Sequence, residues 1–227
     1  MPPQAPIPAE FRALTFEYEP SSDGCNGNLL LLLHGLAIAN GSSHRLKGII
    51  DTRRRLSLLL RYLCCDKGWD PARLFLLGYA QGGSMALDTA ICGDWPLALN
   101  PSATSLGGVV SISGPPLDEM VQAGTSVSSP DFRLNQVAAQ MPILLTHGAD
   151  DNAVPLSEAR AKYTALSTRL HLRLAEFYMI PRKQQTMPNS AEELQKILGF
   201  FAERMVLRDL ALERDPSVIE VERFGQP

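Results

Sequence analysis

The stretch that most constrains the fold runs from Leu74 to Leu87 and reads LFLLGYAQGGSMAL. Four apolar residues at its start are followed by a Gly-x-Ala-x-Gly pattern and then by residues that favour helices. This order predicts a strand, a very tight turn and a helix. The glycines two residues before and two after Ala80 permit a strained backbone at the tip and close packing of helix on strand.

A turn of this kind holds the nucleophile in many hydrolases, and the residue at its tip is then a serine. This chain has Ala80 at the tip, and an alanine carries no nucleophilic atom. The helix that follows still directs N–H groups of its first turn toward the tip. The pattern therefore predicts the scaffold of a serine hydrolase in which the attacking group is missing.

Length and charge exclude several classes of protein. The chain has 227 residues, enough for one α/β domain, and a net charge of −3 with no basic block long enough to suggest a nucleic-acid partner. Its longest aliphatic run, Leu29 to Leu33, is far shorter than the roughly 20 residues that a membrane span needs. We expect a flexible lead-in over residues 1–10, one domain over 11–208 and an irregular charged tail over 209–227.

The four cysteines, at positions 25, 64, 65 and 92, show no spacing typical of a metal site. Cys64, Cys65 and Cys92 fall inside helical patterns, so buried, reduced thiols are expected at these positions, which favours a cytoplasmic protein. No metal and no cofactor is expected from these residues.

Apolar segments alternate with amphipathic ones along the chain, which predicts one α/β domain with a mainly parallel sheet. Ser190 with Glu193 three residues later predicts a helix N-terminus. The three consecutive arginines at 53–55 are expected on a solvated helix face. Expected strands cover 14–18, 29–33 (fully buried), 73–77, 107–112, 143–146 and 170–180, and expected helices cover 49–67, 83–92, 156–167 and 190–208, with a partly helical connector over 117–140.

Five segments, in this order, resemble the phospholipase/carboxylesterase family, which includes the acyl-protein thioesterases. They are residues 31–36 (LLLHGL), 75–83 (FLLGYAQGG), 109–114 (VVSISG), 147–155 (HGADDNAVP) and 187–194 (MPNSAEEL). The similarity extends over about residues 12–207. The resemblance implies a cytoplasmic protein with the α/β-hydrolase fold, and an activity that cleaves carboxylic esters or thioesters without a cofactor. An acyl ester or thioester is therefore the expected ligand.

The resemblance also assigns the catalytic positions. The family nucleophile falls on Ala80, the family acid on Asp151 and the family base on Gln185, so two of the three positions lack the required chemistry. Asp150 is an alternative acid, displaced by one residue. Oxyanion-hole donors in this fold are the backbone N–H of the residue after the nucleophile and a backbone N–H from the loop after an earlier strand. Gln81 and Leu36 occupy these two positions, and neither needs a particular side chain to serve.

Other reactive side chains are weaker candidates. His34 and His147 each follow a strand inside a His-Gly turn, so we expect structural or oxyanion-loop roles for both. His171 is expected to open a strand. Ser84 and Ser113 are candidates for a relocated nucleophile, but neither has a base within reach that the sequence predicts.

Residues 37–47 depart from the family pattern. The resemblance implies a helix and a strand here, but only about a dozen polar and small residues without a clear period are present. The fold is therefore expected to be shortened by about one strand and one helix, which leaves an apolar sheet face uncovered. We expect either self-association through that face or a marginally stable fold that binds hydrophobic dyes, unless the 117–140 connector or the 209–227 tail covers the face.

Three functions are consistent with this pattern. The first is an esterase-like protein that is catalytically impaired. The second is a module on the same fold that binds an acyl ligand or a protein without turnover. The third is an active esterase in which a serine was replaced by Ala80 through engineering, and Gln185 argues against it because one replacement would have been enough.

Overall fold

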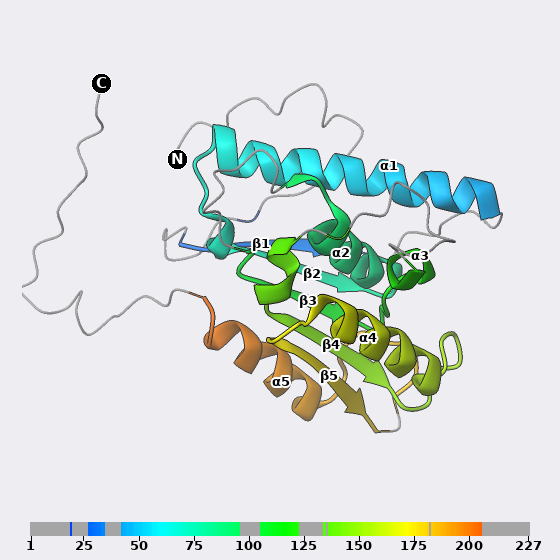
Figure 1. Ribbon diagram of the computed structural model, residues 1–227. Helices are drawn as coiled ribbons and strands as arrows, with labels where there is room; N and C mark the ends of the chain where they lie inside the picture. Colours follow the sequence, from blue (N-terminus) through cyan, green and yellow to red (C-terminus); the bar gives the residue numbers. More distant parts are fainter. Residues whose placement is uncertain are drawn as a thin grey trace, which may run out of the picture.

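The computed structural model describes residues 19, 27–34, 42–95, 105–122, 134, 136–181 and 183–205. Its centre is a sheet of five parallel strands whose spatial order follows the sequence (Figure 1). The parallel sheet that the alternating pattern predicts is thus confirmed. The strands are β1 (Leu29–Leu33), β2 (Leu74–Tyr79), β3 (Gly108–Ile112), β4 (Ile143–Gly148) and β5 (Ala175–Ile180).

Helices cover both faces of this sheet (Figure 1). One face packs against α1 (Ser42–Arg61), α2 (Gln81–Cys92) and α4 (Leu156–Leu170), and the other packs against α5 (Ala191–Ala202). The short helix α3 (Asp118–Gln122) adds Met120 to the core on the first face. Successive strand residues alternate between the two cores, as the two-residue period of a strand requires.

Burial is uneven across the sheet. Every residue of β3 and β4 is buried, whereas β1 is only half-buried and its Leu32 is 68% exposed. The expectation that the 29–33 strand is fully buried is therefore wrong. The reason is its position, because β1 is the outermost of the strands that the structure describes and α5 packs over the strands farther along.

The connection between β1 and β2 is helical over more of its length than the sequence predicts. The helix expected from residue 49 begins at Ser42, so the irregular segment expected over 37–47 is helical in its second half. Beyond Arg61 the helix continues as a π-helical turn, Tyr62–Asp66, and the chain then turns at Gly68, whose φ is +70°. One helix thus carries the crossover between two parallel strands.

Two further boundaries differ from the prediction. The strand expected over 170–180 begins only at Ala175, because α4 extends to Leu170 and His171 ends it in the left-handed conformation, with φ of 50°. The helix expected to reach Arg208 ends at Ala202, although its start is as predicted, since Ser190 Oγ accepts a hydrogen bond from Glu193 N at 3.2 Å.

Several expectations concern residues outside the described ranges. They are the strand at 14–18, the oxyanion position Leu36, most of the 117–140 connector, and the lead-in and tail at the two ends of the chain. Within the described ranges, no helix has both the length and the apolar character needed to cross a membrane.

Candidate active site

The turn between β2 and α2 has the geometry that its glycines predict. Ala80 joins the two elements with φ of 51° and ψ of −121°, a backbone conformation that costs energy for any residue with a side chain. Two hydrogen bonds hold it: Ala80 N donates to Ile112 O at 2.8 Å, and Ser84 N donates to Ala80 O at 3.1 Å. The strained tip is therefore built into the sheet and the helix on both sides.

The glycines around the tip are required by close backbone contacts. A Cβ atom on Gly78 would lie 2.2 Å from Gly82 O, and one on Gly82 would lie 2.1 Å from Leu33 O. In the turn after β3, a Cβ on Gly114 would lie 2.3 Å from Ala80 O. Real Cβ atoms do not approach oxygen this closely, so no side chain fits at these three positions without a shift of the backbone.

The turn after β4, which we call the acid turn (residues 148–155), presents Asp151. One carboxylate oxygen, Oδ1, accepts hydrogen bonds from Ala153 N at 2.9 Å and Val154 N at 3.0 Å. The second oxygen, Oδ2, is buried and has no hydrogen-bond partner among the described residues. Asp150 is exposed, so the geometry favours Asp151 over Asp150 as the residue in the acid position. Oδ1 stabilises the turn, and Oδ2 is the oxygen that could orient a base.

The side chain of His147, in β4, contacts two residues of this turn. Its Nε2 lies 2.9 Å from Val154 O and 3.7 Å from Asp151 Oδ2, and its ring packs on Phe177 with the ring centres 6.3 Å apart. The side chain is fully buried. These contacts fit the structural role that the sequence predicts for His147.

The loop after β5, residues 183–189, carries the position expected for the base and is fixed through its backbone. Tyr79 precedes Ala80 in the turn between β2 and α2, which we call the elbow (residues 78–82), and it donates its hydroxyl hydrogen to Gln185 O at 3.0 Å. Asp150 N donates to Lys183 O at 3.0 Å. The structure therefore brings the loop of Gln185 together with the elbow and with the acid turn, at the carboxyl edge of the sheet.

A buried ion pair that the sequence does not predict fixes the start of this loop. Lys183 Nζ lies 2.5 Å from Glu193 Oε1, and Thr146 Oγ1 donates to the same oxygen at 2.8 Å. The spacing from Ser190 to Glu193 predicts only a helix cap. That cap is present at the backbone N–H of Glu193, but its side chain turns inward and joins α5 to β4 and to the loop.

The serines considered as relocated nucleophiles have no histidine partner among the described residues. Ser84 Oγ donates to Pro115 O at 2.7 Å. Ser113 is buried with φ of 51°, and its Oγ has no hydrogen-bond partner in the described part of the chain. His34 lies exposed after β1 and His171 lies exposed after α4. This arrangement gives no support to a relocated serine–histidine pair.

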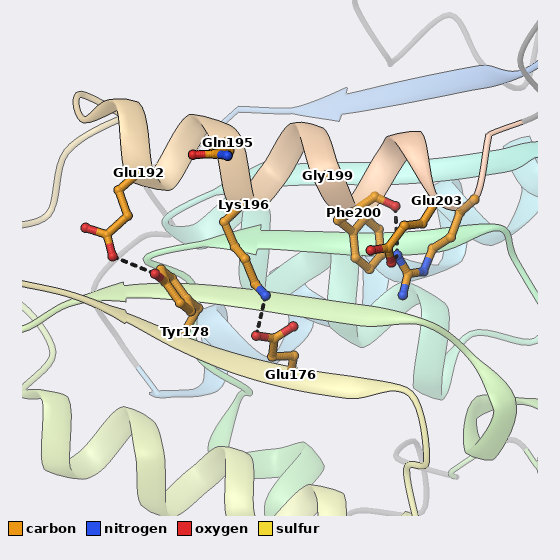
Figure 2. A pocket seen from close by; sticks show the side chains of 9 residues that line it. Glu176, Tyr178, Glu192, Gln195, Lys196, Gly199, Phe200 and Glu203 are labelled. Atoms are coloured by element: carbon orange, nitrogen blue, oxygen red, sulfur yellow. Dashed lines mark hydrogen bonds and ion pairs between the residues drawn. The ribbon is translucent and has the colours of Figure 1, made fainter.

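A groove of about 330 Å³ lies away from the elbow, between β5 and α5 (Figure 2). Glu176 and Lys196 form an ion pair across it at 2.6 Å, and Tyr178 donates to Glu192 at 2.6 Å. Its charged side chains are thus largely satisfied by one another, and none of them belongs to the predicted catalytic positions. The lining residues are Glu176, Tyr178, Glu192, Gln195, Lys196, Gly199, Phe200, Glu203 and Arg204.

A second buried ion pair joins α1 to α2, where Arg53 Nη1 lies 3.2 Å from Asp88 Oδ1. The expectation that Arg53 faces solvent is wrong, whereas Arg54 and Arg55 are exposed as predicted. Burial raises the pKa of Asp88 to about 7, although the Arg53 guanidinium acts in the opposite direction. No group of described residues has the composition of a metal site.

Comparison of the sequence with known proteins identifies the family. A family model described as Phospholipase/Carboxylesterase matches residues 33–203, which is most of the chain. No curated protein sequence matches the chain.

Solved structures share the fold. Esterase PE8 superposes with a TM-score of 0.61 at 19% identity, over 82% of this chain and 97% of PE8. Acyl-protein thioesterase 2 of Zea mays gives 0.56 at 18% identity, over 82% of this chain and 96% of the maize protein. A variant of SOBER1 from Arabidopsis thaliana gives 0.51 at 21% identity over 72% of this chain, which spans 66% of the SOBER1 length. At these identities the likeness establishes the α/β-hydrolase fold.

Proposed function

This chain belongs to the phospholipase/carboxylesterase family, and we propose that it is a catalytically impaired member of it. The family consists of esterase- and thioesterase-like hydrolases, and the chain has their fold. An acyl ester or thioester is the ligand class that this proposal assigns to the site.

The observation that carries the proposal is Ala80 at the tip of an otherwise complete elbow. Its backbone has the strained conformation that presents a nucleophile, and its side chain is a methyl group. An acyl transfer needs an atom with a lone pair at this point, and none is supplied by residue 80. Gln185 strengthens the argument, because an amide has no basic nitrogen to accept a proton.

The expected loss of rate is large. In serine hydrolases, removal of the nucleophile lowers kcat by about a million-fold, and removal of the base as well adds little because the residues act as a unit. The remaining rate comes from binding and from the oxyanion hole. The proposed oxyanion donors, at Gln81 and Leu36, serve through the main chain, so their contribution does not depend on side chains.

We also propose a cytoplasmic location. Within the described ranges, Cys64, Cys65 and Cys92 form no disulfide, as is usual in a reducing compartment, although only Cys92 is buried as predicted: Cys64 is half-buried and Cys65 is exposed.

Two assays on the purified chain test the proposal. Hydrolysis of short-chain p-nitrophenyl esters and of an acyl thioester should not exceed the rate in buffer. A fluorophosphonate probe should not label the protein, because the reagent needs an activated serine hydroxyl. Labelling that maps to a serine, with turnover of either substrate, would contradict the proposal and identify a nucleophile outside the elbow.

A further inference from the structure

The helix α1 carries most of its positive charge on the side that faces solvent. Its sequence contains six lysine and arginine residues and a single acidic residue, Asp51. Arg45 pairs with a carboxylate of α3, and Arg53 pairs with a carboxylate of α2. The other four cations are exposed, and none of them forms an ion pair with a described residue: Lys47, Arg54, Arg55 and Arg61.

Helical spacing brings three of these cations into line. Lys47, Arg54 and Arg61 follow one another at intervals of seven residues, which is close to two turns, so they lie within about 40° of one another around the helix axis. The rise of about 1.5 Å per residue spreads them over about 21 Å. Arg55 lies on the flank of the same face, next to Arg54. We call these four residues the basic stripe.

The basic stripe faces away from the core. The residues of α1 that are buried, among them Ile49, Leu56 and Leu60, lie on the opposite side of the helix. Figure 1 shows α1 as an outer layer of the molecule, over α2 and the sheet. The large apolar side chains that are exposed in the described part of the chain all lie on other elements. The outer face of α1 is therefore charged and has no apolar centre.

Cations on two other helices are neutralised by nearby carboxylates. Lys162 of α4 lies 2.9 Å from Asp118 Oδ1 and 2.7 Å from Glu158 Oε1. Lys196 of α5 lies 2.6 Å from Glu176 Oε1. The chain as a whole has a net charge of −3, so the positive charge of the basic stripe is local and is not a property of the whole surface. Such an asymmetry favours an anionic partner for this one face.

We propose that the basic stripe is a docking surface for an anionic lipid membrane. In the bound state α1 lies parallel to the bilayer, and its four cations contact the negatively charged headgroups. The attraction is electrostatic, because the face has no exposed large apolar side chain that inserts among the acyl chains.

A membrane fits this face better than an acidic protein does. Protein interfaces have a buried centre of aromatic or apolar side chains that supplies most of the binding energy, and the basic stripe has no such centre. A bilayer instead presents a continuous plane of negative charge. A straight helix with cations in line over about 21 Å contacts such a plane along its length.

The net negative charge of the chain does not prevent this contact. At about 0.1 M salt the Debye length is roughly 10 Å, so acidic groups on the far side of the domain are screened from the membrane. Each lysine or arginine near an anionic surface raises the affinity by about fivefold. Four cations less the one charge of Asp51 leave three net positive charges, which corresponds to roughly 100-fold.

Co-sedimentation of the full chain with lipid vesicles in about 0.1 M salt tests the proposal. The chain should partition roughly 100-fold more strongly into vesicles that contain about 30% phosphatidylserine than into vesicles of phosphatidylcholine alone. In about 1 M salt, where the Debye length is roughly 3 Å, the preference should disappear.

Substitutions at Arg54 test whether the basic stripe is responsible. Arg54→Glu changes the local charge by two units and should weaken binding to the phosphatidylserine vesicles by about 25-fold. Arg54→Lys keeps the charge and should keep the binding. Since the Arg54 side chain is exposed, both variants should melt like the unmodified chain.

Arg173→Glu is the matched control for Arg54→Glu. Arg173 is also exposed, and it lies between α4 and β5, at the opposite end of the strand order from β1. Its substitution makes the same change in net charge away from α1, so it should alter vesicle binding by less than about twofold.

Three outcomes would overturn the proposal. The first is a chain that shows no preference for phosphatidylserine vesicles in about 0.1 M salt, including a chain in which another of its segments covers the basic stripe. The second is equal weakening by Arg54→Glu and Arg173→Glu, which would assign the effect to net charge. The third is binding to poly-L-glutamate without binding to vesicles, which would assign the basic stripe to an acidic protein.

Discussion

The elbow around Ala80 and the acid turn around Asp151 present different halves of the proposed catalytic site. At the elbow the backbone has the required strained conformation, but the side chain has no reactive atom. At the acid turn the carboxylate is present, and its Oδ2 has no hydrogen-bond partner among the described residues, but the loop after β5 carries Gln185 and not a histidine at the position expected for the base. Both regions lie at the carboxyl edge of the same sheet.

The groups that are present stabilise the fold, whereas the two missing reactive side chains would not. Gly78 and Gly82 are fixed by backbone contacts, and Asp151 Oδ1 holds two N–H groups of its turn. The structure depends on these groups whether or not the protein is an enzyme. The side chains at 80 and 185 are different: residue 80 is held through its N–H and C=O groups, and residue 185 through its C=O group. Reactive side chains can be absent at these two positions without loss of the scaffold.

The largest effect is expected at the elbow glycines. Gly82→Ala should lower the free energy of unfolding by about 3 kcal/mol or more, or prevent folding, because the new Cβ would lie 2.1 Å from Leu33 O. Denaturant unfolding followed by circular dichroism measures this.

Gly199→Ala is the matched control for that change. Gly199 lies in α5, and a Cβ atom there would meet nothing within 4 Å. The substitution should stabilise the protein by about 0.5–1 kcal/mol, because alanine is the better helix former. Equal effects at 82 and 199 would mean that the elbow backbone is not held as described.

A smaller, pH-dependent effect on stability is expected at Asp88. Unlike Asp151, whose carboxylate accepts hydrogen bonds from backbone N–H groups, the buried Asp88 carboxylate accepts a hydrogen bond from the side chain of Arg53. Its pKa in the folded chain is about 7, well above the ordinary value for aspartate, so folding favours the protonated form. Its contribution to stability is complete below about pH 4 and is lost as the pH rises through 7. Arg53 of α1, Cys92 of α2 and Glu119 of α3 are the charged or titratable groups that act on it.

Thermal melts at pH 5 and pH 8 check this prediction. Asp88→Asn resembles the protonated residue and should be less sensitive to pH. The melting temperature of the unmodified chain, relative to Asp88→Asn, should therefore fall by at least about 3 °C between the two values. A difference that stays constant or rises would show that Asp88 is ionised in the folded chain at pH 5.

The smallest loss of stability is expected when the Asp151 carboxylate of the acid turn is replaced by an amide. Asp151→Asn should change the free energy of unfolding by less than about 1 kcal/mol, because an amide oxygen can accept the same two N–H groups. Asp151→Ala leaves both N–H groups without their acceptor and should cost about 1–3 kcal/mol. If both substitutions are neutral in chemical denaturation, the turn does not depend on Oδ1.

Local backbone patterns made the core of the fold predictable. Gly78, Ala80 and Gly82 fix the elbow through positions two residues apart, and Ser190 fixes the start of α5 through one hydrogen bond. The order of these motifs also places Asp151 and Gln185 at the edge of the sheet where the structure finds them.

Features that depend on tertiary packing were not predictable. Arg53 reads as one of three exposed arginines, but its partner Asp88 lies 35 residues away on another helix. Glu193 reads as a capping residue, yet its side chain binds Lys183. The exposure of Leu32 depends on which strand forms the edge, and five leucines in a row carry no signal of that.

The central claim is that the site has its geometry and lacks only two reactive side chains. Ala80→Ser combined with Gln185→His tests it most directly, with p-nitrophenyl butyrate hydrolysis as the readout and Gln184→His as the control for the position of the base. The account predicts that Ala80→Ser alone restores little, and that the double variant exceeds it by about 100-fold or more, with the gain abolished by Asp151→Asn. A double variant that melts like the unmodified chain but hydrolyses no faster than Ala80→Ser, with histidine at either 185 or 184, would contradict the claim.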